Sequence, residues 1–238
     1  VVGGINPVDD TLTLVRLDIS DGTTIGMVPT AEHAASAYTC SPADRNQMFC
    51  SSDEHLLSID LSTNSVVWTM PLDGPGSVPV LSEDAVLVET GLSAWAINRE
   101  DGAVIWTSNQ STGSRMPLLL AGTTLLVSQV DGSIRGLDSL TGTLSWSSPV
   151  LTGEVCQAAY GNGDLIITTH SGFVEKLSPL DGTVVWSLNG GTSELTACPS
   201  LVMANGYAYS NFPDGTIKAI DLSTGSMVWE AVAATPGK

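Results

Sequence analysis

The sequence predicts an all-β protein of about six four-stranded sheets, and three observations lead to this prediction. One phrase returns along the chain at intervals of 42, 38, 40, 40 and 43 residues. Each copy carries the signals of two strands joined by a tight turn. The segments between copies show few helix signals and hold further apolar strands. Four strands in about 40 residues is the period of a propeller blade and not of a helical array, so we expect a β-propeller of about six blades.

The repeated phrase ends on a tryptophan in five copies and on Gly26 in a degenerate first copy. The five tryptophans are Trp68, Trp106, Trp146, Trp186 and Trp229. Nine residues earlier stands an aliphatic residue followed by a short polar one, as in Leu137 and Asp138, and such polar side chains start turns. Four residues before the tryptophan position stands Asn64 in one copy and a glycine in the others, which are Gly22, Gly102, Gly142, Gly182 and Gly225. Glycine tolerates positive φ, so each copy predicts a β-hairpin.

These repeated residues are interpreted as structural. A tryptophan that returns every 40 residues beside a turn is typical of packing between blades rather than of a ligand site. Trp95 is the one tryptophan outside the register. We expect it to pack between blades as well, with an exposed contact as the alternative.

The units follow one another along the whole chain. The first, residues 1–28, shows three strands where four are expected, at 1–4, 11–18 and 23–28. The other units cover residues 34–70, 77–108, 115–148, 154–188 and 197–231. Strands such as 125–127 and 165–167 are apolar on both faces, which suits sheets sandwiched between neighbours. Residues 1–238 are therefore expected to form a single propeller domain.

Two accounts of ring closure stay open. Residues 231–235 could return along the first unit and supply its missing strand, which would leave no open edge. Alternatively, the sequence is part of a longer chain whose ring has seven or eight blades.

Charge excludes two classes of partner. The net charge is −17 with only eight Lys and Arg, so nucleic acids and anionic membrane surfaces would be repelled. No run of 18 apolar residues occurs, so we expect no membrane insertion in this segment, and an anchor outside it stays open.

The four cysteines are Cys40, Cys50, Cys156 and Cys198. They form no CxxC motif and have no neighbouring histidine at metal spacing, so no zinc site is expected. Cys40 and Cys50 fall on the first two strands of one unit, and the other two occupy similar positions in successive units. Three pairings stay open, with buried free thiols as an alternative. Disulfides would indicate an extracytoplasmic protein, whether secreted, periplasmic or on the cell surface. Residues 109–111 also match the N-glycosylation pattern, which is common by chance.

The repeat resembles that of the pyrroloquinoline-quinone-like (PQQ-like) propeller family. The fullest matches are Leu137-Asp138 with Thr141-Gly142 and Trp146, and the equivalent set ending at Trp229. In WD-type repeats an aspartate follows the tryptophan, which never occurs here. The resemblance implies one of two branches. Its dehydrogenases hold a quinone and calcium with adjacent cysteines, which this sequence lacks. Its non-catalytic members are extracytoplasmic binding platforms and sensor domains, including a lipoprotein that helps to assemble outer-membrane proteins.

Candidate chemistry is sparse. His33, His55 and His170 are scattered without repeated Asp or Ser partners and are interpreted as solvated loop residues. Acidic pairs such as Glu83-Asp84 fall in predicted turns and lack the spacing of a calcium loop. No catalytic, cofactor-binding or metal-binding residue is therefore expected. We expect a non-enzymatic scaffold that binds a protein or peptide through its loop face or blade edges. A truncated quinoprotein dehydrogenase and the sensor domain of a membrane-anchored receptor or kinase are the alternatives.

Overall fold

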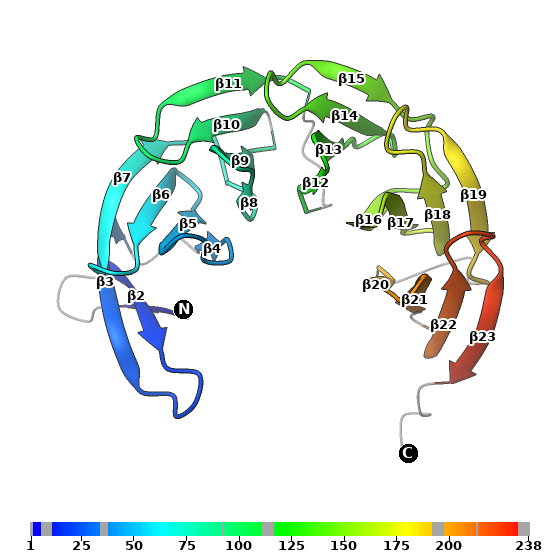
Figure 1. The fold of residues 1–238 in the computed structure, drawn as a ribbon, viewed down its shortest axis with the longest axis horizontal. Helices are drawn as coiled ribbons and strands as arrows, with labels where there is room; N and C mark the ends of the chain where they lie inside the picture. The colour runs from blue at the N-terminus through cyan, green and yellow to red at the C-terminus, as the bar shows by residue number, and fades with distance from the viewer. Residues whose placement is uncertain are drawn as a thin grey trace. The chain divides into compact units, whose positions relative to one another are not determined.

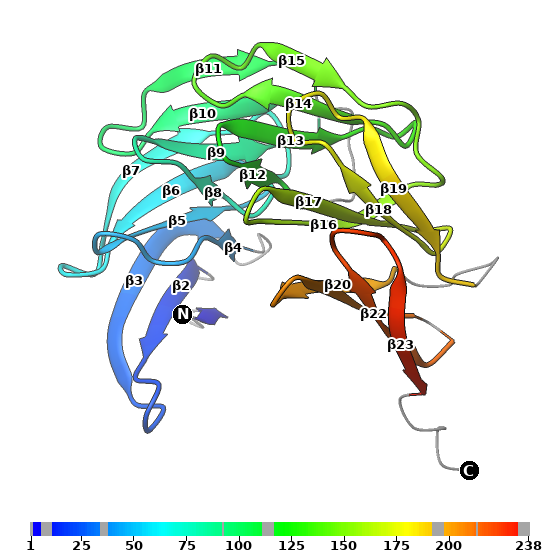
Figure 2. The same ribbon diagram turned by 45° about the vertical axis from the view of Figure 1, so that its right-hand side comes forward.

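The regular structure of the chain consists of antiparallel sheets. The computed structural model describes residues 2–5, 11–33, 38–91, 93–110, 117–191, 198–212 and 214–232. Within these ranges it contains 23 β-strands and no helix, and hence no helical segment suited to crossing a membrane. One sheet has three strands and five have four. We call the sheets blades 1 to 6 in chain order (Figure 1 and Figure 2).

The chain divides into two compact units, Val1–Thr107 and Ser108–Lys238, and each is described by itself. Unit 1 contains blade 1 (β1 Val2–Ile5, β2 Thr11–Leu17, β3 Thr24–His33), blade 2 (β4 Thr39–Cys40, β5 Gln47–Ser51, β6 His55–Asp60, β7 Ser65–Pro71) and blade 3 (β8 Val80–Leu81, β9 Ala85–Glu89, β10 Ala94–Asn98, β11 Val104–Ser108). Unit 2 contains blade 4 (β12 Leu119–Ala121, β13 Thr124–Ser128, β14 Ile134–Asp138, β15 Leu144–Ser147), blade 5 (β16 Val155–Gly161, β17 Asp164–Thr169, β18 Phe173–Leu177, β19 Val184–Asn189) and blade 6 (β20 Ser200–Ala204, β21 Tyr207–Asn211, β22 Thr216–Asp221, β23 Met227–Val232).

Each blade is a meander in which consecutive strands pair, as the repeat predicts. The predicted turn before the last strand is present. In blade 4, the Asp138 carboxylate accepts a hydrogen bond from the Leu140 N–H at 2.9 Å. Gly142 donates its N–H to the Asp138 carbonyl at 2.8 Å and has φ +69°, which glycine adopts without strain. The equivalent carboxylate or amide oxygen accepts the same kind of bond in blades 1, 2, 3 and 6.

Apolar side chains fill the space between neighbouring blades of the same unit. In unit 1, Phe49 and Leu56 of blade 2 pack against Val86, Val88 and Ile97 of blade 3. A second cluster joins blades 1 and 2. In unit 2, clusters of the same kind join blade 4 to blade 5 and blade 5 to blade 6. Burial on both faces explains why the middle strands do not alternate between apolar and polar residues.

Blade 1 has the three strands that the sequence predicts, although β3 continues to His33 instead of ending at residue 28. Residues 231–235 do not act together as the missing strand of blade 1. Ala231 and Val232 continue β23 and pair with Ile217 and Thr216 of their own blade, because this extends an existing ladder. Residues 233–235 lie outside the described residues.

Candidate functional site

The repeated tryptophans and glycines meet between blades of the same unit. Trp146 donates its Nε1–H to the Pro179 carbonyl at 3.1 Å. A Cβ on Gly182 would lie 2.4 Å from Cε3 of the Trp146 ring, so the ring rests directly on this turn and leaves no room for a side chain there. The same contact joins Trp68 to Gly102 and Trp186 to Gly225, with each indole bonded to a carbonyl of the next blade. These side chains hold neighbouring blades together.

Two other tryptophans differ from this pattern. Trp229, on the last strand of blade 6, is 44% exposed, whereas Trp106 and Trp146 are 8% exposed. Its ring lies 6.1 Å from that of Tyr209, measured between centroids. Trp95 lies on β10 and packs against the cluster between blades 2 and 3. Packing is thus the role that the structure gives Trp95.

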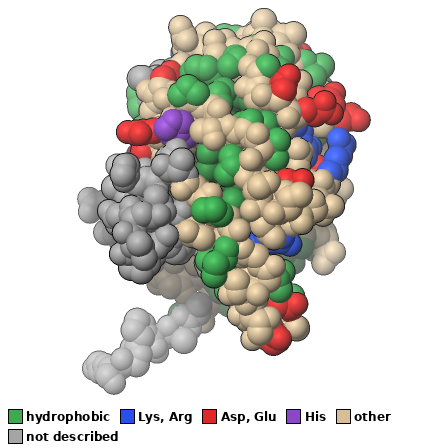
Figure 3. All heavy atoms as spheres, turned by 90° about the vertical axis from the view of Figure 1, so that its left-hand side faces the viewer, with side chains coloured by type: hydrophobic (Ala, Val, Ile, Leu, Met, Phe, Trp, Pro, Cys, Tyr) green, Lys and Arg blue, Asp and Glu red, His purple; other side chains and the backbone are tan. Residues whose placement is uncertain are grey.

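The last strand of each of blades 2 to 6 exposes aliphatic side chains just before the repeated tryptophan. We call these last strands (β7, β11, β15, β19 and β23) the outer strands, since each is an edge of its sheet. The exposed side chains are 38% to 57% accessible and are Val67, Val104, Ile105, Leu144, Val184, Val185, Met227 and Val228. Figure 3 views unit 1 from the side of β3 and β7, where hydrophobic side chains emerge between polar atoms.

A β-bulge accounts for part of this exposure. In blade 5, Lys176 pairs with Trp186 and Leu177 pairs with Val184, so Val185 has no partner across the ladder. The same shift leaves Val67 and Val228 without a partner in blades 2 and 6. A bulge inserts one extra residue and redirects its side chain. The aliphatic residue before the tryptophan is thereby presented on the outside of blades 2, 5 and 6, whereas the bulged residue of blade 4 is Ser145. We call the eight exposed aliphatic side chains of the outer strands the outer aliphatic row.

A polar cleft of about 450 Å³ lies among the turns of blades 2 and 3. Its organising residue is Arg99, which is 4% exposed. The guanidinium contacts the Asp44 carboxylate at 2.7 Å and donates to the Ser82 carbonyl at 3.1 Å. Its charge is therefore already neutralised by a carboxylate. The lining residues include Glu83 and Asp84 but no histidine, serine or cysteine nucleophile.

A smaller cleft of about 340 Å³ lies at the corresponding turns of blades 5 and 6. Here Lys176 contacts the Asp164 carboxylate at 2.6 Å and donates to the Leu222 carbonyl at 3.0 Å. The nearby Asp221 carboxylate accepts hydrogen bonds from Ser223 and Thr224, and these bonds lower its pKa below the usual value. In each cleft the basic side chain, Arg99 or Lys176, is thus paired with a carboxylate and a main-chain carbonyl.

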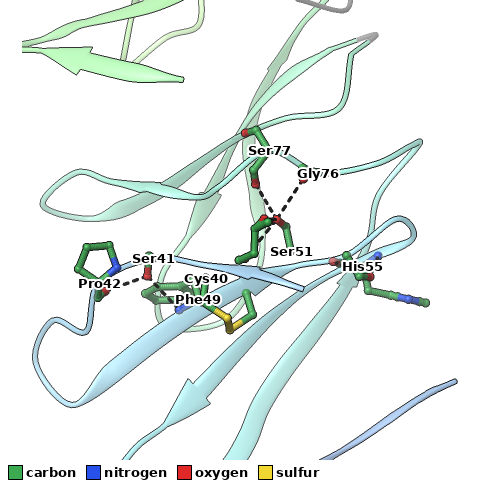
Figure 4. The surroundings of a disulfide bond; sticks show 11 residues. Cys40, Ser41, Pro42, Phe49, Ser51, His55, Gly76 and Ser77 are labelled. Atoms are coloured by element: carbon green, nitrogen blue, oxygen red, sulfur yellow. Dashed lines mark hydrogen bonds between the residues drawn. A yellow bond between two sulfur atoms is a disulfide. The ribbon is translucent and has the colours of Figure 1, made fainter. Parts of the chain in front are cut away.

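All four cysteines are paired. Disulfides join Cys40 to Cys50 and Cys156 to Cys198, which decides among the three pairings and excludes free thiols. The first lies within the first hairpin of blade 2, where Figure 4 shows the Ser51 hydroxyl bonded to the Gly76 and Ser77 carbonyls. The second joins the start of β16 to the segment before β20.

The structure places one histidine, His170, beside the second disulfide. The sequence did not predict this proximity. His170 Nδ1 lies 3.8 Å from Cys198 Sγ, although 28 residues separate them in the chain. No local motif signals this proximity. His33 and His55 lie on β3 and β6, so these two are strand residues instead of the expected loop residues. Ser111 of the glycosylation pattern lies outside the described residues.

A family model described as outer membrane protein assembly factor BamB matches residues 10–153 and 96–238. The chain belongs to this BamB-like family. The match agrees with the PQQ-like repeat recognised in the sequence, and it overlaps across the boundary between the two units. No curated protein matches the chain.

Solved structures show the same fold as this BamB-like chain. BamB from Moraxella catarrhalis is 18% identical with a TM-score of 0.72, over 96% of this chain and 75% of that one. The computationally designed Ika8 protein is 18% identical with a TM-score of 0.79, over 95% and 72%. The C-terminal WD40 domain of Sif2 is 12% identical with a TM-score of 0.76, over 94% and 66%. The fold is therefore an all-β propeller of about six blades.

Proposed function

We propose that this BamB-like protein is a non-enzymatic, extracytoplasmic scaffold that binds an extended segment of a partner protein along its outer strands. The observation that carries this proposal is the outer aliphatic row. Exposed apolar residues are common on protein surfaces when they are scattered. Here they occupy the same positions in successive blades, next to the free edge of a sheet, which is the arrangement that peptide binding by strand addition uses.

The bulge limits where a partner strand can pair. At Val185 the ladder is irregular. Residues 186–189 of β19 pair regularly with β18 on one side, and none of the described strands pairs with them on the other. A partner strand would therefore pair with residues 186–189, beyond the bulge. Its apolar side chains would then contact Val184 and Val185, the exposed aliphatic residues of this strand. Because the net charge is −17, a neutral or basic segment would associate faster than an acidic one.

Two further observations support a protein partner outside the cytoplasm. The two disulfides are typical of oxidising compartments. The description of the family as an outer membrane protein assembly factor supports a role in contacting other proteins. We also propose that residues 1–238 act as one propeller domain, since the family matches overlap across residues 96–153.

The binding proposal is tested with a display library of extended peptides of about ten residues, the length of a long strand. Selected peptides are measured by fluorescence anisotropy. The double variant Val184→Lys/Val185→Lys should bind at least about tenfold more weakly, because two charges replace the apolar contacts. Leu180→Lys is the matched control: Leu180 is 88% exposed in the preceding turn of the same blade. Failure to select any peptide, or equal loss in both variants, would contradict the proposal.

The absence of catalysis is tested separately. We expect no oxidation of alcohols or sugars when quinone and Ca²⁺ are added. The melting temperature should also stay unchanged, since a ligand that binds the native state raises it. Turnover would favour the dehydrogenase alternative instead.

A further inference from the structure

Three potential metal ligands gather where blades 5 and 6 meet. They are Cys156, His170 and Cys198, whose Sγ, ring nitrogen and Sγ atoms all lie within 4.8 Å of one another. Among the described residues this is the one such group of three or more histidine, cysteine or acidic side chains. Cys156 is buried, His170 half-buried and Cys198 exposed.

The fold positions each ligand through a different element. Cys156 sits at a bulge in β16, where Val155 pairs with Thr169 and Gln157 with Thr168. A bulge turns a side chain away from its regular direction. His170 follows the end of β17, held by a bond from its N–H to the Glu154 carbonyl at 2.7 Å. Cys198 comes two residues before β20. Cys156 and His170 therefore stand on backbone that is hydrogen-bonded at blade 5, and Cys198 is held next to them by the disulfide.

Their spacing fits one metal ion once the sulfurs are reduced. In a tetrahedral zinc site with Zn–S of about 2.3 Å and Zn–N of about 2.0 Å, neighbouring sulfur and nitrogen ligands are about 3.5 Å apart. Cys198 Sγ and His170 Nδ1 are 3.8 Å apart. The Cys156 and Cys198 Cα atoms are 5.5 Å apart, so two thiolates can reach one ion by side-chain rotation. Exposure of Cys198 leaves the fourth position to water.

We propose that Cys156, Cys198 and His170 form a redox-gated site for a thiophilic metal ion such as Zn²⁺. In the oxidised protein the two sulfurs bond to each other and the site is closed. In the reduced protein they bind the metal as thiolates with the His170 ring as third ligand. Two thiolates and an imidazole suit zinc better than calcium or magnesium, which prefer oxygen.

The gating step is a thiol–disulfide exchange with a dithiol reductant. One thiolate of the reductant attacks the exposed Cys198 Sγ, the disulfide bond breaks, and Cys156 leaves as a thiolate. The second thiol of the reductant then displaces Cys198, so the protein gains two electrons and the reductant becomes a disulfide. Metal binding releases the remaining thiol protons.

The other disulfide provides a control within the same chain. Cys40 and Cys50 pair within one hairpin, and no described histidine joins them in a group of potential ligands. His55 is the histidine drawn near this bridge, and its ring points away from the sulfurs (Figure 4). Reduction should therefore create a metal site at the second pair and not at the first.

The experiment uses the chain of 238 residues with the substitutions Cys40→Ser and Cys50→Ser. The protein is reduced with a phosphine, and the reductant is then removed under an oxygen-free atmosphere. Zn²⁺ is titrated in competition with a chromophoric chelator. We expect one Zn²⁺ per reduced chain and none per oxidised chain. His170→Ala should weaken binding at least about tenfold, and His55→Ala should leave it unchanged. Co²⁺ should give thiolate charge-transfer absorption that His170→Ala alters.

The comparison of the two histidine variants keeps the test decisive. Thiols of an unfolded chain would bind zinc equally with or without His170, and that result would overturn the proposal. Absence of zinc binding by the reduced chain would overturn it as well. If the serine variant does not fold by circular dichroism, the same histidine comparison is made in the reduced chain with all four cysteines.

Discussion

The contact between Trp146 and Gly182 makes a quantitative prediction. Gly182→Ala adds a methyl group 2.4 Å from Cε3 of a ring that is 8% exposed. The ring cannot move away, because it packs in the cluster between blades 4 and 5 and donates a hydrogen bond to Pro179. Gly163→Ala is the matched control in the same blade. Gly163 also has a positive φ, +85° against +73°, but nothing lies within 4 Å of its added Cβ.

The two variants separate backbone strain from steric clash. An alanine at positive φ costs about 1 to 2 kcal/mol, and both variants incur this cost. Overpacking adds about 1 to 3 kcal/mol in Gly182→Ala alone. We therefore expect Gly182→Ala to lower the free energy of unfolding by about 2 to 5 kcal/mol and Gly163→Ala by about 1 to 2 kcal/mol.

The measurement is urea denaturation followed by far-ultraviolet circular dichroism. A double-mutant cycle with Trp146→Ala completes it, because removal of the ring removes the clash. In that background Gly182→Ala should cost about as much as Gly163→Ala does in the wild type. Equal costs for the two glycine variants in the wild-type background would refute the proposed steric role of Gly182.

Three further predictions concern stability. Trp186→Ala should lower the free energy of unfolding by about 3 to 5 kcal/mol. Trp229→Ala should lower it by much less, because Trp229 is 44% exposed. Urea titrations of the two variants measure both free energies of unfolding. Removing the Cys156–Cys198 bridge should destabilise the protein by about 4 kcal/mol, and removing the Cys40–Cys50 bridge by about 3 kcal/mol. The difference arises because loop-closure entropy grows with loop length, and the paired cysteines are 42 and 10 residues apart. If calorimetry gave the reverse order, this entropic account would be wrong. Hydrogen bonds from turn hydroxyl and N–H groups lower the pKa of the Asp138 and Asp221 carboxyls below 3.8 in the folded protein. The ionised carboxylates therefore stabilise the fold fully when the pH is above their pKa in the unfolded chain. This stabilisation is lost as the pH falls through their lower pKa in the folded protein. The melting temperature should therefore drop below about pH 4, and Asp221→Asn should reduce that drop.

Much of the fold follows from local sequence. The Asp138 to Gly142 turn needs only an oxygen acceptor and a residue that tolerates positive φ, both within five residues. The same local rule gives the equivalent turns of blades 1, 2, 3 and 6. Local sequence also places Cys40 and Cys50 on the first two strands of one blade, but only the structure decides that they pair. The repeat length then sets four strands to a blade, and even the missing strand of blade 1 is visible as a gap in the pattern.

Tertiary structure alone decides which distant groups meet. Gly182 supports Trp146 from the next blade, and His170 reaches Cys198 across 28 residues, because neighbouring sheets stack face to face and bring equivalent positions together. The bulge that exposes Val185 also arises only when two strands pair with unequal numbers of residues. The sequence by itself therefore determines the strands, the turns and the repeat, which depend on near neighbours. The outer aliphatic row and the cluster of two cysteines and a histidine depend on how whole sheets pair and pack, since each is made of residues that contact or align only after folding.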